Sequence, residues 1–342
     1  MNIALLAGGM SWGKKESLAI TVRQYAQELQ RRGHRVVIIS EKKGGLAEEV
    51  EDGVSLFRAD GGVIFAYVRA FREAQKIGRF DVIHGFSAAP FFIVRSWLCK
   101  LLEPRARIVH TLKSYSRSKF GCYFTWLLNF AHAVTVPTEV YRRKLRFVRN
   151  VSVVRSHIDT TVFHQYSAAE RAKVRKALKL PKPVLFYYGA TWDEKGVDVL
   201  FRALRLLLDK GVFLLVVTRY ELESSLRELI QTLQLGDHIR VVNEKINVPD
   251  YLNAVDVCVL PYKNLKGTEG NPSCLLEAAA CNTPVVTTRL PELEEIFDGI
   301  MVRPNDPHAL AEGILLALRS THPIDVAQFD VKKVTDDFLR LY

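Results

Sequence analysis

The residues best suited to chemistry lie in one segment of the C-terminal half, Thr268 to Ala280, which reads TEGNPSCLLEAAA. Pro272 suits the first turn of a helix, and the Ala/Leu run behind it is strongly helical. We therefore expect Glu269 on a loop and Glu277 about one and a half turns into a helix. Free backbone N–H groups at Ser273, Cys274 and Leu275, with the positive end of the helix dipole, favour a phosphate. Gly270 and Asn271 complete the predicted contacts.

The two carboxylates of this segment, Glu269 and Glu277, would repel a phosphate. They make sense if they instead accept hydrogen bonds from hydroxyl groups, one on a ribose and one on a sugar. A nucleotide diphosphate sugar offers that combination of groups. The alternative is ordinary helix capping and a solvated helix face.

A second candidate segment, Gly189 to Gly196, reads GATWDEKG and follows an apolar run that we expect to be a strand. Lys195 is a candidate cation for a diphosphate, and Gly189 and Thr191 are candidate contacts beside it. Arg219 ends another predicted strand, Phe213–Thr218, and is expected to point towards the same crevice. A surface arginine is the alternative.

Candidates in the N-terminal half are fewer. Gly8-Gly9 follows the first apolar run and could bring the backbone N–H of Gly9 near a phosphate, although the spacing to Gly13 does not form a dinucleotide-binding glycine motif. His110 and Lys113 end a predicted strand, and such folds bind ligands at the carboxyl edge of the sheet.

Apolar runs alternate with helical periodicity along the whole chain, which predicts right-handed βαβ units and parallel sheets. The pattern begins again after Pro183, so we expect an α/β protein with two Rossmann-like, doubly wound domains facing a cleft. The predicted bounds are 1–165, 166–325 and a terminal helix, 326–342, that returns to the N-terminal domain. The predicted strands are Asn2–Ala7, Val36–Ile39, Asp81–His84, Arg107–Leu112, Ala133–Pro137, Val184–Tyr188, Phe213–Val217, Ile239–Val242, Val255–Leu260, Pro284–Thr288 and Ile300–Val302.

The composition is that of a soluble globular protein, with 342 residues, 48% hydrophobic and 25% charged. Five scattered cysteines favour a reducing compartment, and nine histidines show no metal-ligand spacing, so we expect a cytoplasmic protein without a metal or other cofactor. The N-terminus shows neither a basic leader nor a signal-peptide run. The longest uncharged run, Gly121 to Pro137, is too short to span a membrane and is interpreted as a buried helix followed by a buried strand.

The net charge is +11, and all of the basic excess lies in the first half. Residues 1–165 hold 26 Lys and Arg against 13 Asp and Glu, so the rest of the chain is slightly acidic. Basic residues gather around aromatic ones in Lys113–Lys119 and Tyr141–Arg149. Contact with an anionic membrane surface or a lipid-pyrophosphate acceptor is one interpretation, and a solvated helix face is the other. No nucleic-acid-binding motif accompanies the charge.

The motifs of this chain and their order along it resemble those of the family-4, retaining glycosyltransferases of GT-B fold. Glu-x7-Glu followed by Glu-Ala-x-Ala-x-x-x-Pro-Val-Val is similar to the donor-site signature of that family. The resemblance spans nearly the whole chain. Weaker matches are Gly33-His34-Arg35-Val36, Asp81-Val82-Ile83-His84, Ile158-Asp159 to Phe163, Asp298-Gly299 and Pro304-Asn305-Asp306.

The resemblance implies transfer of a sugar, with retention, from a nucleotide sugar to a carbohydrate or lipid-linked acceptor. It implies that Glu277 binds the ribose, Glu269 the sugar and Lys195 the diphosphate, with leaving phosphate assisting the acceptor. The chain departs from the family at Ala190, where an arginine is usual, and at Lys113, where a histidine is common. Either His110 or Lys113 is then the contact to the donor sugar.

Other functions remain open on the sequence alone. The missing arginine at Ala190 is compatible with a non-catalytic subunit that only binds a nucleotide sugar. A nucleotide-sugar epimerase on the same fold is a further alternative, although no paired catalytic carboxylates support it.

Overall fold

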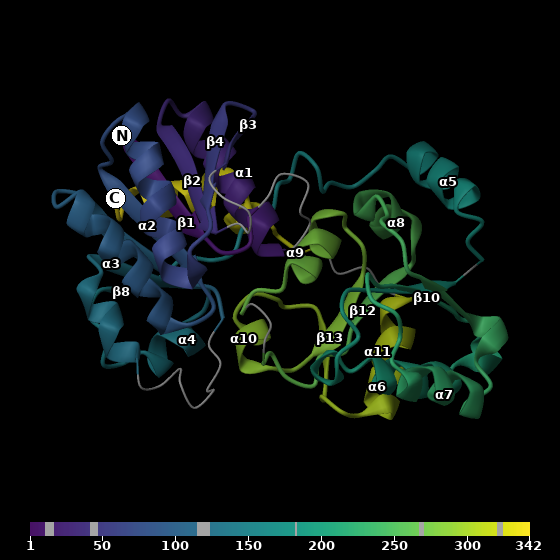
Figure 1. Cartoon of the computed structure of the whole chain (residues 1–342). Coiled ribbons are helices and arrows are strands. Elements are labelled where there is room, and N and C mark those ends of the chain that lie inside the picture. Colours follow the sequence, from purple (N-terminus) through teal and green to yellow (C-terminus); the bar gives the residue numbers. More distant parts are fainter. Residues whose placement is uncertain (11–16, 42–46, 115–123, 182, 267–269, 320–323) are drawn as a thin grey trace. The chain divides into compact units, whose positions relative to one another are not determined.

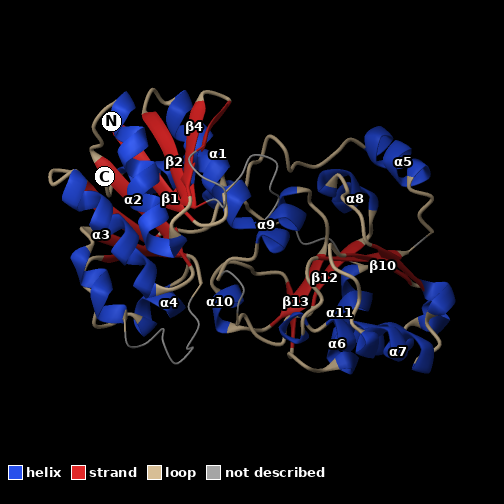
Figure 2. Ribbon diagram, in the orientation of Figure 1, coloured by secondary structure: helices blue, strands red, loops and turns tan. Residues whose placement is uncertain are grey.

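The computed structural model describes residues 1–10, 17–41, 47–114, 124–181, 183–266, 270–319 and 324–342. These residues form two compact units (Figures 1 and 2). Unit 1 comprises Met1–His157, Gly270 and Gln328–Tyr342 among the described residues, and unit 2 comprises the described parts of Ile158–Lys266 and Asn271–Ala327. The chain thus divides after His157 rather than after the predicted residue 165.

Unit 1 is built on an eight-stranded sheet in the order β3-β4-β2-β1-β5-β6-β7-β8, parallel except for the pair β3 and β4. The order of the strands reverses between β1 and β5. Strands β2, β4 and β3 lie beyond β1 on one side, and β6, β7 and β8 lie beyond β5 on the other. Such a reversal is where doubly wound folds bind ligands. The strands are β1 Asn2–Ala7, β2 Arg35–Glu41, β3 Ala47–Glu51, β4 Val54–Ala59, β5 Val82–Ser87, β6 Arg107–Leu112, β7 Ala133–Val136 and β8 Val151–Val153.

Both faces of this sheet are buried, which explains why its central strands are continuously apolar. Ile3 and Leu5 of β1 pack into the cluster beneath α1, while Ala4 and Leu6 pack into the cluster beneath α2. The helices of unit 1 are α1 Ser17–Arg31, α2 Gly62–Ala74, α3 Ile93–Leu102, α4 Glu139–Lys144 and α12 Val331–Leu339.

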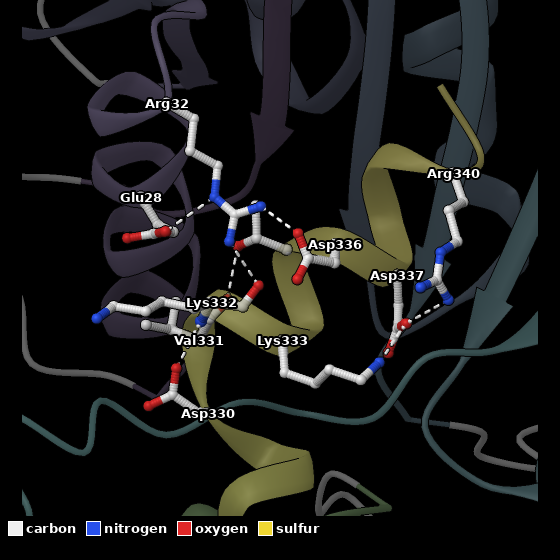
Figure 3. A network of polar contacts seen from close by, with 10 residues as sticks. Glu28, Arg32, Asp330, Val331, Lys332, Lys333, Asp336, Asp337 and Arg340 are labelled. Atoms are coloured by element: carbon white, nitrogen blue, oxygen red, sulfur yellow. Dashed lines mark hydrogen bonds and ion pairs between the residues drawn. The ribbon is translucent and has the colours of Figure 1, made fainter.

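The C-terminal helix α12 packs against α1 of unit 1 (Figure 3). Val334 and Phe338 join the apolar cluster under α1, and Tyr25 contacts Phe338 with ring centroids 4.9 Å apart. Arg32, directly after α1, bonds the Asp336 carboxylate and the carbonyl of Lys332, so apolar burial and polar contacts hold the same helix.

Unit 2 contains a six-stranded parallel sheet in the order β11-β10-β9-β12-β13-β14, the order of a doubly wound nucleotide-binding fold. The order of its strands reverses between β9 and β12. The strands are β9 Val184–Tyr188, β10 Phe213–Val217, β11 Ile239–Val242, β12 Val257–Leu260, β13 Val285–Thr288 and β14 Ile300–Val302. The helices are α5 Ala168–Ala177, α6 Val197–Arg205, α7 Ser224–Thr232, α8 Val248–Ala254, α9 Ser273–Ala280, α10 Pro291–Glu294 and α11 Pro307–Ala317.

The polar connector that precedes this sheet is itself ordered. Helix α5 begins with a capping box, in which Ser167 and Glu170 bond each other's backbone. Arg171 and Arg175 from α5 then bond the Asp256 carboxylate just before β12. Tyr166 donates its hydroxyl to Asp250 at 2.8 Å. These bonds explain why the segment after His157 belongs to unit 2.

The fold prediction is confirmed, because every predicted strand is present with bounds shifted by at most a few residues. The short strands β3, β4 and β8 were not predicted. The interpretation of Gly121–Pro137 as a buried helix and strand is wrong for residues 125–130, and residues 121–123 lie outside the described residues. Residues 125–130 form a 3-10 helix in which only Leu128 is buried, because so short a helix has just one side against the sheet.

Candidate functional site

The loop after β9 lies at the reversal of the unit 2 sheet, and two glycines define its path. Gly189 has φ of 141° and donates its N–H to the carbonyl of Val217 at 3.0 Å. Gly196 has φ of 69°, and a Cβ there would overlap the carbonyl oxygen of Pro261, which follows β12. Only glycine therefore brings this loop so close to the end of β12.

Lys195 ends this loop, in a 3-10 turn formed by Asp193–Lys195. Its Nζ lies 5.2 Å from the ring centroid of Tyr262, a cation–π contact beyond the end of β12. Its positive charge also opposes the burial that raises the pKa of the Cys274 thiol at the start of α9. Lys195 is thus near the N-terminus of α9, as the sequence predicted for a diphosphate site.

A second lysine holds the 3-10 turn in place. Lys263 Nζ lies 2.6 Å from Asp193 Oδ1 and 2.9 Å from Asp198 Oδ1, and its backbone N–H donates to the carbonyl of Glu194. Because its charge is balanced by two carboxylates, Lys263 is suited to positioning the loop rather than to binding an anion.

Glu277 is half-buried in α9 and faces the end of β9. The Tyr188 hydroxyl donates to Glu277 Oε2 at 2.6 Å and lies 3.1 Å from the carbonyl of Cys274. Burial raises the pKa of Glu277 to about 7, although the hydrogen bond from Tyr188 and the charge of Arg219 both act to lower it. A carboxyl group with this pKa changes charge near neutral pH.

Arg219 follows β10 and is exposed. The last paired residues of β10 and β9 are Val217 and Tyr188, so Arg219 and Ala190 each lie two residues beyond that pair. Among the described residues, no hydrogen bond or ion pair engages its guanidinium, yet its charge acts on the Glu277 carboxyl. Arg219 therefore supplies a positive charge beside the position where the sequence lacks one.

The remaining predicted contacts at α9 have different environments. Asn271 is fully buried, and neither of its side-chain amide atoms has a hydrogen-bond partner among the described residues. Leu275 was predicted to offer a free N–H, but that group donates to the carbonyl of Pro272 at 3.1 Å, because the first turn closes on itself. Ser273 and Cys274 are half-buried, and Thr191 is buried.

Two predicted residues fall elsewhere. Glu269 lies outside the described residues. Gly270 groups with unit 1, where its N–H donates to the carbonyl of Lys113 at 3.3 Å. The structure thus brings Glu277, Lys195 and Arg219 together in unit 2.

In unit 1, the N–H of Gly9 is already bonded. It donates to Glu41 Oε1 at 2.9 Å, and the other carboxylate oxygen of Glu41 accepts from the Tyr67 hydroxyl. Arg95 in turn donates to that hydroxyl at 2.7 Å. A phosphate at Gly9 would have to displace the Glu41 carboxylate. The predicted phosphate contact of Gly9 stays a prediction, and this arrangement disfavours it.

His110 and Lys113 lie in different surroundings at the end of β6. His110 is fully buried, its Nε2 lies 2.9 Å from Ser87 Oγ, and burial lowers its pKa to about 3. It is a neutral interior ring. Lys113 is 7% exposed, and its Nζ lies 3.4 Å from Ser156 Oγ. Of the two predicted sugar contacts, Lys113 is the one with any surface access.

Within the part of the chain that the structure describes, no group of three or more His, Cys, Asp or Glu side chains is arranged to hold a metal ion. None of the helices in that part combines the length and apolar character needed to cross a membrane.

Sequence reasoning missed the two tyrosines of the site. Tyr188 and Tyr262 lie at or just after the carboxyl ends of β9 and β12, where they contact Glu277 and Lys195. Their signal in the sequence is an aromatic residue with a hydroxyl group at the carboxyl end of an otherwise aliphatic strand. That signal does not say which side chain the hydroxyl meets.

Two protein families match the chain, one in each half. Residues 18–162 match "Glycosyltransferase Family 4", and residues 182–320 match "Glycosyl transferases group 1".

Among curated relatives, the lipopolysaccharide core biosynthesis mannosyltransferase LpsB of Rhizobium meliloti is 29% identical over 206 residues, 58% of this chain and 56% of LpsB. The putative colanic acid biosynthesis glycosyltransferase WcaL of Salmonella typhimurium is 32% identical over 206 residues, 55% of this chain and 47% of WcaL. The chain thus aligns with about half the length of each relative.

Solved structures share the fold over the whole chain. Sucrose-phosphate synthase from Thermosynechococcus elongatus superposes with a TM-score of 0.80 at 20% identity, covering 100% of this chain and 98% of that one. Anabaena HepE, in complex with UDP and glucose, gives 0.79 at 16% identity, covering 99% of this chain and 98% of that one. The chain therefore has the GT-B fold, with an N-terminal half that matches Glycosyltransferase Family 4 and a C-terminal half that matches glycosyl transferases group 1.

Proposed function

We propose that this chain is a glycosyltransferase of polysaccharide or glycolipid biosynthesis that takes its sugar from a nucleotide-sugar donor bound by unit 2. The observation that carries the proposal is the Glu277–Tyr188 pair, half-buried at the reversal of the sheet and accompanied by the cations Lys195 and Arg219. A carboxylate beside two cations suits a ligand that has both hydroxyl groups and a diphosphate.

In this proposal Glu277 accepts hydrogen bonds from the ribose hydroxyls. Its half-buried position favours the role, because a hydrogen bond to a carboxylate is stronger where water is partly excluded. Tyr188 orients the carboxylate by occupying one oxygen and leaving the other for the ligand. Loop residues 244–246, after β11, are proposed to line the base.

Lys195, Arg219 and the N–H groups at the start of α9 bind the diphosphate. Negative charge develops on the diphosphate as its bond to the sugar breaks, and preorganised cations stabilise that charge. Arg219 takes the place of the cation that Ala190 lacks. The proposal includes no metal ion.

The proposal also assigns residues to the sugar and its acceptor. We propose that Glu269 holds the sugar together with backbone groups of residues 270–273. Lys113 is preferred over His110 for a further sugar contact, because His110 is buried and neutral. A carbohydrate or lipid-linked acceptor would bind on the unit 1 side, and the reaction would take place in the cytoplasm.

The proposed reaction is a front-face displacement with retention. The acceptor hydroxyl oxygen bonds to the anomeric carbon as the bond to the leaving diphosphate oxygen breaks, and the hydroxyl proton passes to that diphosphate. No protein nucleophile is required. Retention is proposed from the family resemblance.

The test is thermal unfolding of the protein with UDP-, GDP-, ADP- and dTDP-sugars, since a ligand that binds only the folded state raises the melting temperature. HepE is solved with UDP-glucose, which makes the UDP-sugars the first to try. Parallel titrations with EDTA and with Mg²⁺ test the metal-free proposal, which expects equal shifts.

Glu277→Ala is the test variant, and Glu228→Ala, at an exposed position of α7, is its control. A shift with one nucleotide class that survives in the control and disappears in Glu277→Ala supports the donor site and names the base. No shift with any nucleotide, in a protein that unfolds cooperatively, overturns it. Donor binding without turnover of any sugar would leave the non-catalytic subunit, and isomerisation of the donor alone would indicate an epimerase.

A further inference from the structure

One part of unit 1 exposes large apolar side chains next to one another. Trp126 is 58% exposed and Phe130 51% in the 3-10 helix that precedes β7, and Trp97 is 44% exposed on α3. Their rings are in contact, with centroids 5.8 Å apart for Trp126 and Phe130 and 6.0 Å for Trp97 and Phe130. Leu101, one turn beyond Trp97, is 62% exposed.

Phe147 is the most exposed large apolar side chain of the described residues, at 78%, and it lies close to this group. The Asn129 side-chain amide donates to the carbonyls of both Trp126 and Phe147, at 3.2 and 3.3 Å. Asn129 Oδ1 accepts from the N–H of Arg149 at 2.7 Å. One polar side chain thus ties the two exposed segments together. We call Trp97, Leu101, Trp126, Phe130 and Phe147 the apolar surface.

The apolar surface rests on a packed base. Leu128 is fully buried between Trp126 and Phe130 in the chain, and it joins Val134 and Leu145 in a core cluster. Helix α3 packs against β5 and β6 and against the 3-10 helix. The exposed rings are therefore held by structure beneath them, and their exposure does not come from a loose chain end.

Positive charge accompanies the apolar surface. Residues 124–150 contain five Lys and Arg and one acidic residue, Glu139, which pairs with Arg142 at 2.7 Å. All five cations are exposed, and the guanidinium of Arg146 lies 4.8 Å from the ring centroid of Phe147. The basic group consists of Arg142, Arg143, Lys144, Arg146 and Arg149, on α4 and the segment leading to β8.

We propose that the apolar surface and the basic group together dock unit 1 onto an anionic phospholipid bilayer. Tryptophan and phenylalanine enter the boundary between head groups and acyl chains, and Lys and Arg bind the lipid phosphates. A contiguous exposed apolar patch marks an interaction site, and its cationic neighbours complement a negatively charged membrane. The inference stands on unit 1 alone and does not depend on the donor site of unit 2.

The measurement is sedimentation of the full chain with vesicles of phosphatidylcholine, alone or mixed with phosphatidylglycerol. Two variants separate the contributions. Trp126→Ser with Phe147→Ser removes rings, and Arg143→Glu with Arg146→Glu reverses charge. Phe65→Ser, an equally exposed ring on α2, and Arg202→Glu, an exposed arginine on α6 in unit 2, are the matched controls.

The wild-type chain should bind the mixed vesicles at least about tenfold more tightly than the neutral ones, because several cations face the anionic lipid. The ring variant should weaken binding by about tenfold at every salt concentration, because burial of apolar surface is insensitive to salt. The charge variant should weaken binding to a similar extent at low salt and lose the difference at high salt, because salt screens it. Both controls should bind as the wild type.

Tryptophan fluorescence gives a second readout. Lipids brominated in the acyl chain should quench the wild-type fluorescence, and Trp126→Phe should remove much of that quenching whereas Trp192→Phe in unit 2 should not. Each variant must retain the wild-type melting temperature and any donor-induced shift. Equal binding to both vesicle types, equal binding by all variants, or no binding would overturn the proposal. Loss of a wild-type dimer in the ring variant without any vesicle binding would identify the surface as a contact between two copies.

Discussion

The Tyr188 hydroxyl donates to Glu277 Oε2 at 2.6 Å, joining the end of β9 to helix α9 across the reversal of the unit 2 sheet. The two residues are far apart in sequence, and the parallel pairing of β9 with β12 brings them together. Their hydrogen bond gives the predicted donor site its defined carboxylate, and it leads to the first two predictions.

Donor affinity should depend on pH around neutrality. Ribose hydroxyls donate to the ionised form of Glu277, whose pKa is about 7, so affinity should fall about tenfold per pH unit below that value. Tyr188→Phe removes a bond that lowers this pKa, so the fall should begin at a higher pH. Calorimetric titration of a nucleotide sugar from about pH 8 to about pH 6 measures both curves. A flat profile in the wild type would exclude Glu277 as the hydroxyl acceptor.

The stability of the protein without ligand should also depend on the ionisation of Glu277, but in the opposite direction: it should fall as pH rises. The pKa of Glu277 is raised from its ordinary value of 4.5, so the folded state holds the proton more tightly than the unfolded state does. Stability from this group is fully present below about pH 4.5 and is lost as pH rises through about 7. The melting temperature of the wild type minus that of Glu277→Gln should therefore decrease over this range. An increasing difference would mean that the carboxylate is stabilised in the fold.

Arg219 should replace the cation that Ala190 lacks. Arg219→Ala should weaken binding of a nucleotide diphosphate by about tenfold or more, as expected for a lost charged hydrogen bond, while Arg202→Ala should have no effect. Because Arg219 and Ala190 each lie two residues beyond the paired Val217 and Tyr188, Ala190→Arg should restore affinity to Arg219→Ala. Affinities come from titration with the free nucleotide diphosphate. If Arg219→Ala binds the nucleotide diphosphate as tightly as the wild type does, Arg219 is a surface residue with no role in binding.

Gly196 and Gly211 of unit 2 form a matched pair. Gly196 and Gly211 have φ of 69° and 65°, but a Cβ at Gly211 meets nothing within 4 Å, whereas one at Gly196 overlaps the Pro261 carbonyl. Gly211→Ala should cost about 1 kcal/mol of unfolding free energy and leave donor binding intact. Gly196→Ala should cost about 2 kcal/mol or more and reduce donor binding, because the Lys195 loop must move. Denaturant unfolding and donor titration measure these effects, and similar results for both variants would contradict the close approach.

Tyr342, which follows the C-terminal helix α12, should stabilise unit 1. Its hydroxyl bonds Tyr25 at 2.8 Å and His84 Nδ1 at 2.6 Å in the interior. Tyr342→Phe leaves both partners buried without it and should lower the unfolding free energy by about 1–3 kcal/mol. Tyr220→Phe, at an exposed tyrosine, should not. The donor-induced shift in melting temperature should persist in Tyr342→Phe, because the proposed nucleotide-binding residues Glu277, Lys195 and Arg219 lie in unit 2. Its loss would show that the two units are coupled.

All strands except β3, β4 and β8 could be predicted, because most of their residues are apolar and buried, as in Val184–Tyr188. The 3-10 helix around Trp126 could not. Six residues give no periodicity from which to tell a buried side from an exposed one, and the absence of charged residues suggested a buried segment. The N–H of Leu275 was misjudged for a related reason, because the closure of one turn on Pro272 depends on backbone angles that residue type does not specify.

The sequence by itself predicted two parallel-sheet domains and eleven of their strands, and it placed Lys195 and Arg219 in loops after strands and Glu277 in a helix, because local periodicity and motif spacing act over a few residues. Only the tertiary structure decided that Tyr188 bonds Glu277, that Arg219 lies level with Ala190, that His110 is interior, and that Trp126 and Phe147 are exposed together. Those facts depend on strand register and on packing between residues distant in the chain, and contacts of that kind leave no signal in the spacing of neighbouring residues.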